Sequence, residues 1–171
     1  MKTRDIHRVE RRHDMMKSHH IEEHRHDPYK ARAKLSEPCV CPKCMAVFTR
    51  GRWQWTTKPL KRAHWGRCPA CHRINDKYPA GELTMRGSFL KTHSREIVRL
   101  ARNTEALEKR EHPLQRIMEI EVRPDRIVIT TTDIHLPRRI GHAIVDAYKG
   151  ELDTHYDNSA YFIRIVWKRG A

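Results

Sequence analysis

The sequence predicts an α+β protein in which a small four-cysteine module is followed by a long helix and a ββαββ domain. Three observations support this fold class. Two Cys-Pro-x-Cys pairs, ending at Cys44 and starting at Cys68, are separated by 23 residues. Apolar residues recur at spacings of three and four within residues 81–112, which is typical of an amphipathic helix. In residues 113–171, apolar and polar residues alternate on both sides of a second helical pattern, which predicts half-buried strands.

Residues 1–37 are polar, basic and rich in histidine, and apolar side chains are sparse there. Such a composition does not bury enough apolar surface to fold alone, so we expect a flexible arm that becomes helical on a partner. Two interpretations remain open for this arm. It either binds nucleic acid or is a solvated tail.

Residues 38–80 contain the two cysteine pairs and predict a zinc ribbon. Each Cys-Pro-x-Cys pair closes a tight turn, and two such pairs can supply the four corners of a tetrahedral zinc site. We expect one structural Zn²⁺ ion. The expected ligands are Cys41, Cys44, Cys68 and Cys71. Cys39 lies close to the first pair, and its replacement of Cys41 as a ligand is the main alternative.

The ribbon also predicts a short hairpin, with strands at residues 47–49 and 52–55 and a turn at Gly51. Trp53 and Trp55 would then lie on one face of a strand. Indoles flanked by cations suit base stacking and phosphate contact. The alternative is that the tryptophans, Trp65 included, form the small core of the ribbon or dock it to the next domain.

The apolar stripe in residues 81–112 predicts one long helix that is buried on one side. Thr84 or Ser88 can cap its start, and Pro113 ends it. The stripe consists of Met85, Phe89, His93, Ile97, Leu100, Thr104 and Leu107.

Residues 113–171 predict two hairpins around a helix. Asp133 can cap that helix, Pro137 falls in its first turn, and Gly150 closes it. An antiparallel four-stranded sheet with the helices on one face would satisfy all of these patterns. Arg138 and Arg139 in the first turns oppose the helix dipole, which indicates either contact with an anion or a solvated face.

The chain carries a formal net charge of +14, and residues 38–80 hold nine Lys/Arg against one Asp/Glu. Such a concentrated positive charge favours a polyanionic partner, most often nucleic acid. The residues expected to contact RNA are Arg50, Arg52, Trp53, Trp55, Lys58, Lys61, Arg62, Arg67, Arg138 and Arg139.

Several functional classes find no support in the sequence. No apolar run is long enough to span a bilayer, and the N-terminus has no apolar segment of a secretory signal. We therefore expect a cytoplasmic protein without a membrane partner. No catalytic residue constellation or glycine-rich phosphate loop is present, and a four-thiolate zinc site leaves no position open for water. We expect neither an enzyme nor a small-molecule substrate.

Four segments resemble one family, and together they extend over roughly residues 28–168. They are residues 38–44, Gly-Arg-Trp-Gln-Trp at 51–55, Cys-Pro-Ala-Cys at 68–71, and Ile-Thr-Thr-Thr-Asp-Ile-His-Leu-Pro-Arg-Arg-Ile-Gly at 129–141. The chain resembles small bacterial zinc-ribbon proteins related to the archaeal and eukaryotic nonsense-mediated-decay-three protein, the export adaptor of the large ribosomal subunit. That adaptor carries further zinc pairs and domains that this chain lacks. The resemblance implies ribosomal RNA or ribosome binding, supports the four zinc ligands, and supplies no catalytic residue.

The sequence thus predicts a non-enzymatic zinc-ribbon protein that binds structured RNA on the ribosome or on a ribosome-assembly intermediate. Two alternatives remain. One is a DNA-binding regulator or accessory factor that uses the ribbon and the arm. The other is a protein-interaction module in which the sheet binds a partner and the zinc ion has only a structural role.

Overall fold

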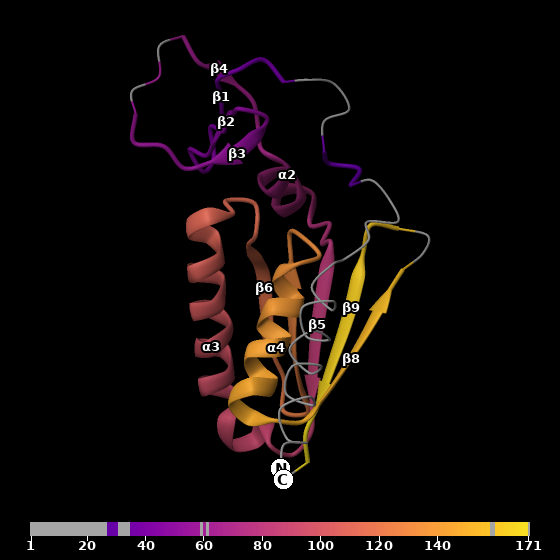
Figure 1. The fold of residues 1–171 in the computed structure, drawn as a ribbon. Coiled ribbons are helices and arrows are strands. Elements are labelled where there is room, and N and C mark those ends of the chain that lie inside the picture. Colours follow the sequence, from indigo (N-terminus) through magenta and orange to yellow (C-terminus); the bar gives the residue numbers. More distant parts are fainter. Residues whose placement is uncertain (1–26, 31–34, 59, 61, 158–159, 171) are drawn as a thin grey trace, which may run out of the picture.

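The computed structural model describes residues 27–30, 35–58, 60, 62–157 and 160–170 (Figure 1). Most of the predicted arm, residues 1–26 and 31–34, lies outside the described residues, and so does Lys61. Two parts of the chain follow. We call residues 38–80 the ribbon and residues 81–170 the sheet domain. Figure 1 shows the ribbon at one end of the sheet domain, with α2 between the two.

Four short strands form the sheet of the ribbon, in the order β3-β2-β1-β4. They are β1 (Cys39–Val40), β2 (Val47–Thr49), β3 (Arg52–Gln54) and β4 (His64–Trp65). The predicted hairpin is present, with Arg50 and Gly51 as its two turn residues and φ angles of 53° and 76°. Two positive φ angles suit a tight turn that matches the strand twist. The Glu37 carboxylate accepts hydrogen bonds from both turn amides.

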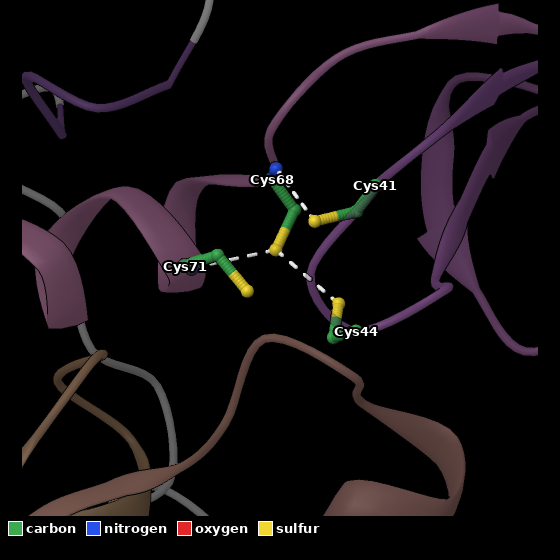
Figure 2. Close-up of side chains that lie close together, drawn as sticks. All are labelled: Cys41, Cys44, Cys68 and Cys71. Carbon is green, nitrogen blue, oxygen red and sulfur yellow. Dashed lines mark hydrogen bonds between the residues drawn. The ribbon is translucent and has the colours of Figure 1, made fainter.

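The ribbon ends in a helix that the sequence analysis did not predict, α2 (Pro69–Asp76). Cys68 precedes it in extended geometry, and its sulfur accepts a hydrogen bond from the Cys71 N–H at 3.4 Å (Figure 2). Pro69 at the first position needs no hydrogen bond from its nitrogen. Lys77, with a φ of 51°, ends the helix. The second cysteine pair is therefore a helix start as well as a turn.

The sheet domain is built on a mixed five-stranded sheet in the order β6-β7-β5-β9-β8. Its strands are β5 (Gly81–Arg86), β6 (Ile117–Val122), β7 (Arg126–Thr131), β8 (Glu151–Tyr156) and β9 (Ile163–Lys168). The prediction of an antiparallel four-stranded sheet is wrong, because β5 lies at its centre, antiparallel to β7 and parallel to β9. The predicted ββαββ unit is therefore not separate from the residues that precede it.

The helix predicted for residues 81–112 begins later, as α3 (Leu90–Glu111). Gly87 separates it from β5, with a φ of +123° and no room for a side chain, because a Cβ would lie 1.8 Å from the Arg169 carbonyl oxygen. The predicted caps are also wrong. Thr84 belongs to β5, and α3 starts after Phe89 without a side-chain cap.

The second helix is α4 (Leu136–Tyr148), and its N-cap position is His135, two residues after the predicted cap Asp133. The Asp133 carboxylate accepts hydrogen bonds from the N–H groups of His135 and Leu136, at 3.1 and 3.2 Å. Pro137 lies in the first turn. Gly150, with a φ of +98°, follows the helix and leads into β8.

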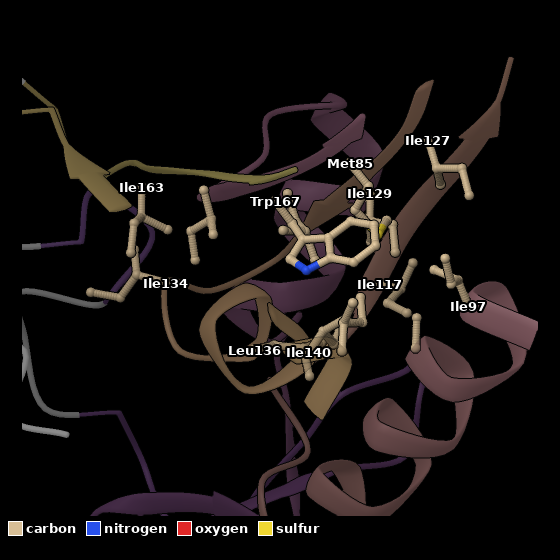
Figure 3. Close-up of a cluster of buried hydrophobic side chains, with 14 of the residues drawn as sticks. Met85, Ile97, Ile117, Ile127, Ile129, Ile134, Leu136, Ile140, Ile163 and Trp167 are labelled. Atoms are coloured by element: carbon tan, nitrogen blue, oxygen red, sulfur yellow. The ribbon is translucent and has the colours of Figure 1, made fainter. Parts of the chain in front are cut away.

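Both α3 and α4 cover the same face of the sheet (Figure 1). Trp167 is fully buried in the core between helices and sheet (Figure 3). Its Nε1 donates to the Lys149 carbonyl at 2.8 Å. The core includes Leu83, Met85, Ile97, Ile127, Ile129, Leu136, Ile140, Ile144, Ile163 and Ile165. Within the part of the chain that the structure describes, no helix combines the length and the apolar character needed to cross a membrane.

The opposite face of the sheet is polar. Its residues alternate with the buried ones along each strand, so the register of the five strands places them side by side. They are Glu82, Thr84, Arg86, Glu119, Glu121, Arg126, Val128, Thr130, Glu151, Asp153, His155, Arg164, Val166 and Lys168. None of these described side chains is Phe, Tyr or Trp, and the ring that this face does carry is the imidazole of His155.

Candidate metal centre

Four cysteines lie together at the junction of the ribbon and the sheet domain (Figure 2). Two come from the turn between β1 and β2 and two from the start of α2. The sulfur atoms of Cys41, Cys44, Cys68 and Cys71 all lie within 4.8 Å of one another, and none is in a disulfide. This cysteine cluster is the expected ligand set, and it can hold a metal ion.

The first pair is held by a tight backbone turn. The Met45 N–H donates to the Cys41 carbonyl, and the Cys41 N–H donates to the Ala46 carbonyl, both at 2.9 Å. Met45 has a φ of 64°, in the left-handed region. This turn brings the Cys44 sulfur to 3.7 Å from the Cys68 sulfur.

Hydrogen bonds to sulfur favour the thiolate form of one ligand. The Cys68 N–H donates to the Cys41 sulfur at 3.4 Å. Burial raises the pKa of the Cys41 thiol, but hydrogen bonds from backbone amides outweigh burial and lower that pKa to about 6. Burial instead raises the pKa values of the Cys68 and Cys71 thiols. Repulsion from the neighbouring thiolates raises both pKa values further. A bound cation would offset this mutual repulsion.

A buried arginine lies against the cluster. Arg116, in the loop before β6, donates from Nη1 to the Cys71 sulfur at 3.3 Å and from Nε to the Pro113 carbonyl at 2.7 Å. Burial lowers the pKa of Arg116, but the cysteine thiolates raise it further, so the net shift is upward. The sequence analysis missed this residue. Its contact with Cys71, 45 residues away in the chain, depends on tertiary packing and has no spacing signature.

A small apolar cluster surrounds the sulfurs. Trp53 and Leu114 pack against the cysteines, and Trp53 also contacts Phe48, with ring centroids 5.6 Å apart. Cys39 is buried in β1 and lies outside the cluster, next to Gly66, where a Cβ would lie 2.8 Å from the Cys39 sulfur. The choice of Cys41 over Cys39 therefore agrees with the geometry.

The predicted RNA-contact cations of the ribbon differ in exposure. Arg50, Arg52, Lys58 and Arg62 are exposed, and Arg67 is half-buried. None of these five forms an ion pair with an acidic residue in the described part of the chain. Lys61 lies outside the described residues.

The tryptophans of the ribbon have different environments. Trp53 packs against the cysteine cluster. Trp55 lies just beyond β3, and its Nε1 donates to the Lys109 carbonyl at 2.6 Å, which docks the ribbon on the end of α3. Trp65 in β4 is 66% exposed. Two of the three thus contact the protein, and Trp65 faces outward.

The two arginines of α4 are engaged within the chain. Arg139 Nε lies 3.0 Å from a Glu108 carboxylate oxygen. Arg138 is half-buried near Tyr156: burial raises the pKa of Tyr156, and Arg138 lowers it. The unfavourable position of Arg139 near the helix start is therefore balanced by an acidic residue of α3.

A cleft of about 760 Å³ lies between the ribbon and the sheet domain. Its lining comes from six parts of the chain: the residues Asp27, Tyr29, Lys30 and Leu35, the β2–β3 hairpin, the start of α2 with the preceding Arg67, the α3–β6 loop, the β7–α4 loop, and Tyr161 between β8 and β9. The β7–α4 loop contributes Thr132, Asp133 and His135.

Searches against protein-family models, curated proteins and solved structures gave no match.

Proposed function

We propose that this chain is a cytoplasmic, non-enzymatic zinc-ribbon protein that binds structured RNA on the ribosome or on a ribosome-assembly intermediate. The ribbon supplies the main contact surface. One structural zinc ion, held by the cysteine cluster, fixes the fold of the ribbon. The observation that carries the proposal is the set of exposed ribbon cations without acidic partners among the described residues.

The geometry of the cluster fits zinc. A tetrahedral site with Zn–S bonds of about 2.3 Å has sulfur–sulfur edges of about 3.8 Å. The observed Cys44–Cys68 sulfur distance is 3.7 Å, and the other pairs lie within 4.8 Å. Thiolates are soft ligands that select zinc among the common divalent metals. Four protein ligands fill a tetrahedral coordination sphere, which supports a structural role and no catalysis.

The charge of the ribbon fits a polyanion. Residues 38–80 hold nine Lys/Arg and one Asp, and four thiolates with one Zn²⁺ would reduce the net charge of +8 by two. Ion pairs occupy only some of the arginines of the chain: Arg73 of the ribbon pairs with Asp27, and in the sheet domain Arg102 pairs with Glu105, Arg123 with Glu121, Arg139 with Glu108 and Arg164 with Asp157. Cations without partners are those available to phosphates.

Aromatic residues also distinguish the ribbon from the sheet. Trp65 is exposed in the ribbon, whereas the described residues on the polar face of the sheet include no Phe, Tyr or Trp. Exposed indoles stack on unpaired bases, which structured RNA offers in loops and bulges. The resemblance to the ribosome-binding family supports the ribosome as the source of that RNA.

Co-sedimentation with ribosomes through a sucrose cushion tests the proposal. The wild-type protein should pellet with ribosomes at low salt and be released as salt rises, because phosphate contacts depend steeply on ionic strength. The double variant Arg50→Glu/Arg52→Glu should stay in the supernatant. The matched control is Arg86→Glu/Lys168→Glu on the polar sheet face, which changes the net charge equally and should still pellet.

Two outcomes would contradict the proposal. A wild-type protein that does not pellet with ribosomes at low salt does not bind them. Equal loss of binding in both double variants would mean that total charge, and not the ribbon, governs association. Nuclease treatment of the copurified nucleic acid separates the DNA alternative, since DNase and not RNase would then release the protein.

A further inference from the structure

Strand β8 forms one edge of the five-stranded sheet, and within the described residues it pairs only with β9 (Figure 1). An edge strand offers a row of N–H and C=O groups to another strand, and natural proteins protect such edges with proline, lysine or a bulge. The opposite edge strand, β6, has a bulge between Ile117 and Glu119. In β8 there is no proline or lysine, and the register with β9 is unbroken. This edge is therefore suited to the addition of a strand.

The backbone groups that point outward from β8 belong to every second residue. Just beyond the strand, the Asp157 N–H donates to the Phe162 carbonyl at 3.0 Å, so the backbone groups of Asp157 point toward β9. Successive residues of a strand point their N–H and C=O groups to alternate sides, so those of Asp153 and His155 also point toward β9. The even-numbered residues point theirs to the open side. These are Leu152, Thr154 and Tyr156.

The side chains of β8 match a second copy of the same strand. With a twofold axis at Thr154, an antiparallel pair sets Asp153 opposite His155 of the second copy, and Leu152 opposite Tyr156. Asp153 and His155 are both exposed, whereas Leu152 and Tyr156 both pack partly against the core. Each residue thus meets a partner on its own face of the sheet. The Asp153–His155 pairs are the non-hydrogen-bonded ones, in which side chains come closest, so the carboxylate can accept from the imidazole.

Other registers lack this match. An axis at Asp153 places the two Asp153 carboxylates opposite each other, and an axis at His155 sets Asp153 opposite Asp157. An axis between two residues pairs side chains from opposite faces of the sheet. In the first register the one like-charged pair is Glu151 with Asp157, and the Asp157 carboxylate lies 3.9 Å from Arg164 Nη1. Charge and face therefore select a single register.

We propose that the protein forms a twofold dimer through β8, in which the sheets of two copies join into one. The axis passes through the pair of Thr154 residues. Backbone hydrogen bonds link these two residues, and further ones link each Leu152 with Tyr156 of the second copy. A twofold interface uses the same surface on both copies, so each favourable contact occurs twice. The dimer uses no residue of the proposed RNA-contact surface and stands independently of RNA binding.

Sedimentation equilibrium of the nuclease-treated full chain, supplied with zinc, tests the dimer. The fitted mass should rise from that of one chain toward that of two as protein concentration increases. Thr154→Pro should abolish association. The Thr154 N–H points to the open side, so proline removes no hydrogen bond to β9 but prevents pairing with an approaching strand. Far-UV circular dichroism and thermal unfolding should show this variant folded.

An exchange of charges tests the register. His155→Asp sets two carboxylates opposite each other at both pairs, and it should weaken dimerisation about tenfold. Asp153→His should also weaken it, because imidazoles then face each other. The double variant Asp153→His/His155→Asp exchanges the partners and should return the affinity to within about threefold of the wild type. The control is Asn103→Asp, which adds a carboxylate at an exposed position on α3 and should dimerise as the wild type does.

Three results would overturn the proposal or its register. A wild-type protein that stays monomeric at its highest soluble concentration forms no such dimer. Dimerisation that survives Thr154→Pro would place the interface away from β8. If the double variant stays as weak as His155→Asp, the axis does not lie at Thr154, and the proposed register is wrong.

Discussion

The buried guanidinium of Arg116 lies beside the sulfurs and donates to Cys71. Groups that hydrogen-bond metal ligands orient them and tune metal affinity. Arg116 also adds a positive charge next to the cysteine cluster, and four thiolates holding one Zn²⁺ ion would carry a net charge of −2. Replacement by methionine, which keeps much of the volume, should lower zinc affinity by about 10- to 100-fold. Competition with a chromophoric chelator measures this loss.

The control for this prediction is Arg102→Met. Arg102 forms an exposed ion pair with Glu105 on α3, at 3.5 Å, and exposed pairs contribute little to stability. Its zinc affinity should equal that of the wild type. If Arg116→Met retains wild-type affinity, the guanidinium only packs against the cluster and does not stabilise the bound metal.

Asp133 gives the fold a pH dependence. Burial raises the pKa of Asp133 to about 7, against the opposing hydrogen bonds from His135 and Leu136. In the unfolded chain the carboxyl ionises near pH 4. Stability from this group is therefore present at low pH and falls as pH rises from about 4 to about 7, by roughly 4 kcal/mol in total. Above that pH its contribution is constant.

The variant Asp133→Asn isolates this effect, because asparagine keeps an acceptor for the helix amides and cannot ionise. Between pH 5.5 and 7 the wild type should lose about 2 kcal/mol of unfolding free energy relative to the variant. Urea unfolding at several pH values measures the difference. Changes in unfolding free energy that come from metal binding cancel between the wild type and Asp133→Asn, since both proteins carry the same cysteines. Parallel pH profiles would mean that Asp133 is ionised in the folded protein.

Local residues and distant contacts differ in what the sequence predicts. The four clustered cysteines could be predicted because each Cys-Pro-x-Cys pair is local in the chain. The hydrogen bonds of Asp133 to the start of α4 could be predicted because they join residues two and three positions apart. The contact of Arg116 with Cys71 could not be predicted, because it arises where separate parts of the chain meet and no local pattern encodes such a meeting.

At the scale of elements, two tryptophans of the ribbon have opposite expected roles. They are Trp65, in β4, and Trp55, the residue after β3. Trp65→Ala removes an exposed ring and should weaken RNA binding about tenfold without changing thermal stability. Trp55→Phe removes the hydrogen bond to Lys109 and should lower stability by about 1 kcal/mol, with RNA affinity unchanged. Anisotropy and thermal unfolding of both variants measure this. Loss of RNA affinity in Trp55→Phe alone would reverse the assignment.

Because β5 is the central strand of the sheet, we expect truncation of a leucine in β5 to cost much more stability than truncation of a leucine on α3. Leu83 in β5 is fully buried, whereas Leu107 on α3 is 61% exposed. Leu83→Ala should cost about 3 kcal/mol because it leaves a cavity between sheet and helices. Leu107→Ala should change stability by less than about 0.5 kcal/mol. Chemical unfolding of the two variants compares them. Equal costs would contradict the placement of β5 at the centre of the sheet.

The sequence misled at β5 for a physical reason. Met85 and Phe89 are four residues apart and extend the stripe of α3, so the helical period continues into the strand. The strand pairs with β7 and β9, which lie far along the chain, and no turn signal marks either pairing. Gly87 was the available signal, since a left-handed residue interrupts both elements. The hairpins of sequential strands were predictable because their turns are local.

At the scale of the whole molecule, the apolar residues form two separate clusters. One consists of the cysteines with Trp53 and Leu114, and the other fills the space between α3, α4 and the five-stranded sheet. The ribbon is fixed to the sheet domain by contacts such as Arg116 with Cys71 and Trp55 with Lys109. We therefore expect the ribbon to depend on a metal ion bound by the cysteine cluster, whereas the sheet domain has an apolar core of its own.

Removal of the metal should consequently unfold one part of the molecule. Small zinc modules lose their fold without the ion, whereas the sheet domain keeps its core. After treatment with a zinc chelator, hydrogen exchange should show lost protection in residues 38–80 and retained protection in β5, β7 and β9. RNA binding should be lost at the same time and return when zinc is restored. Exchange that rises equally in both parts would show instead that the metal stabilises the protein as a single cooperative unit.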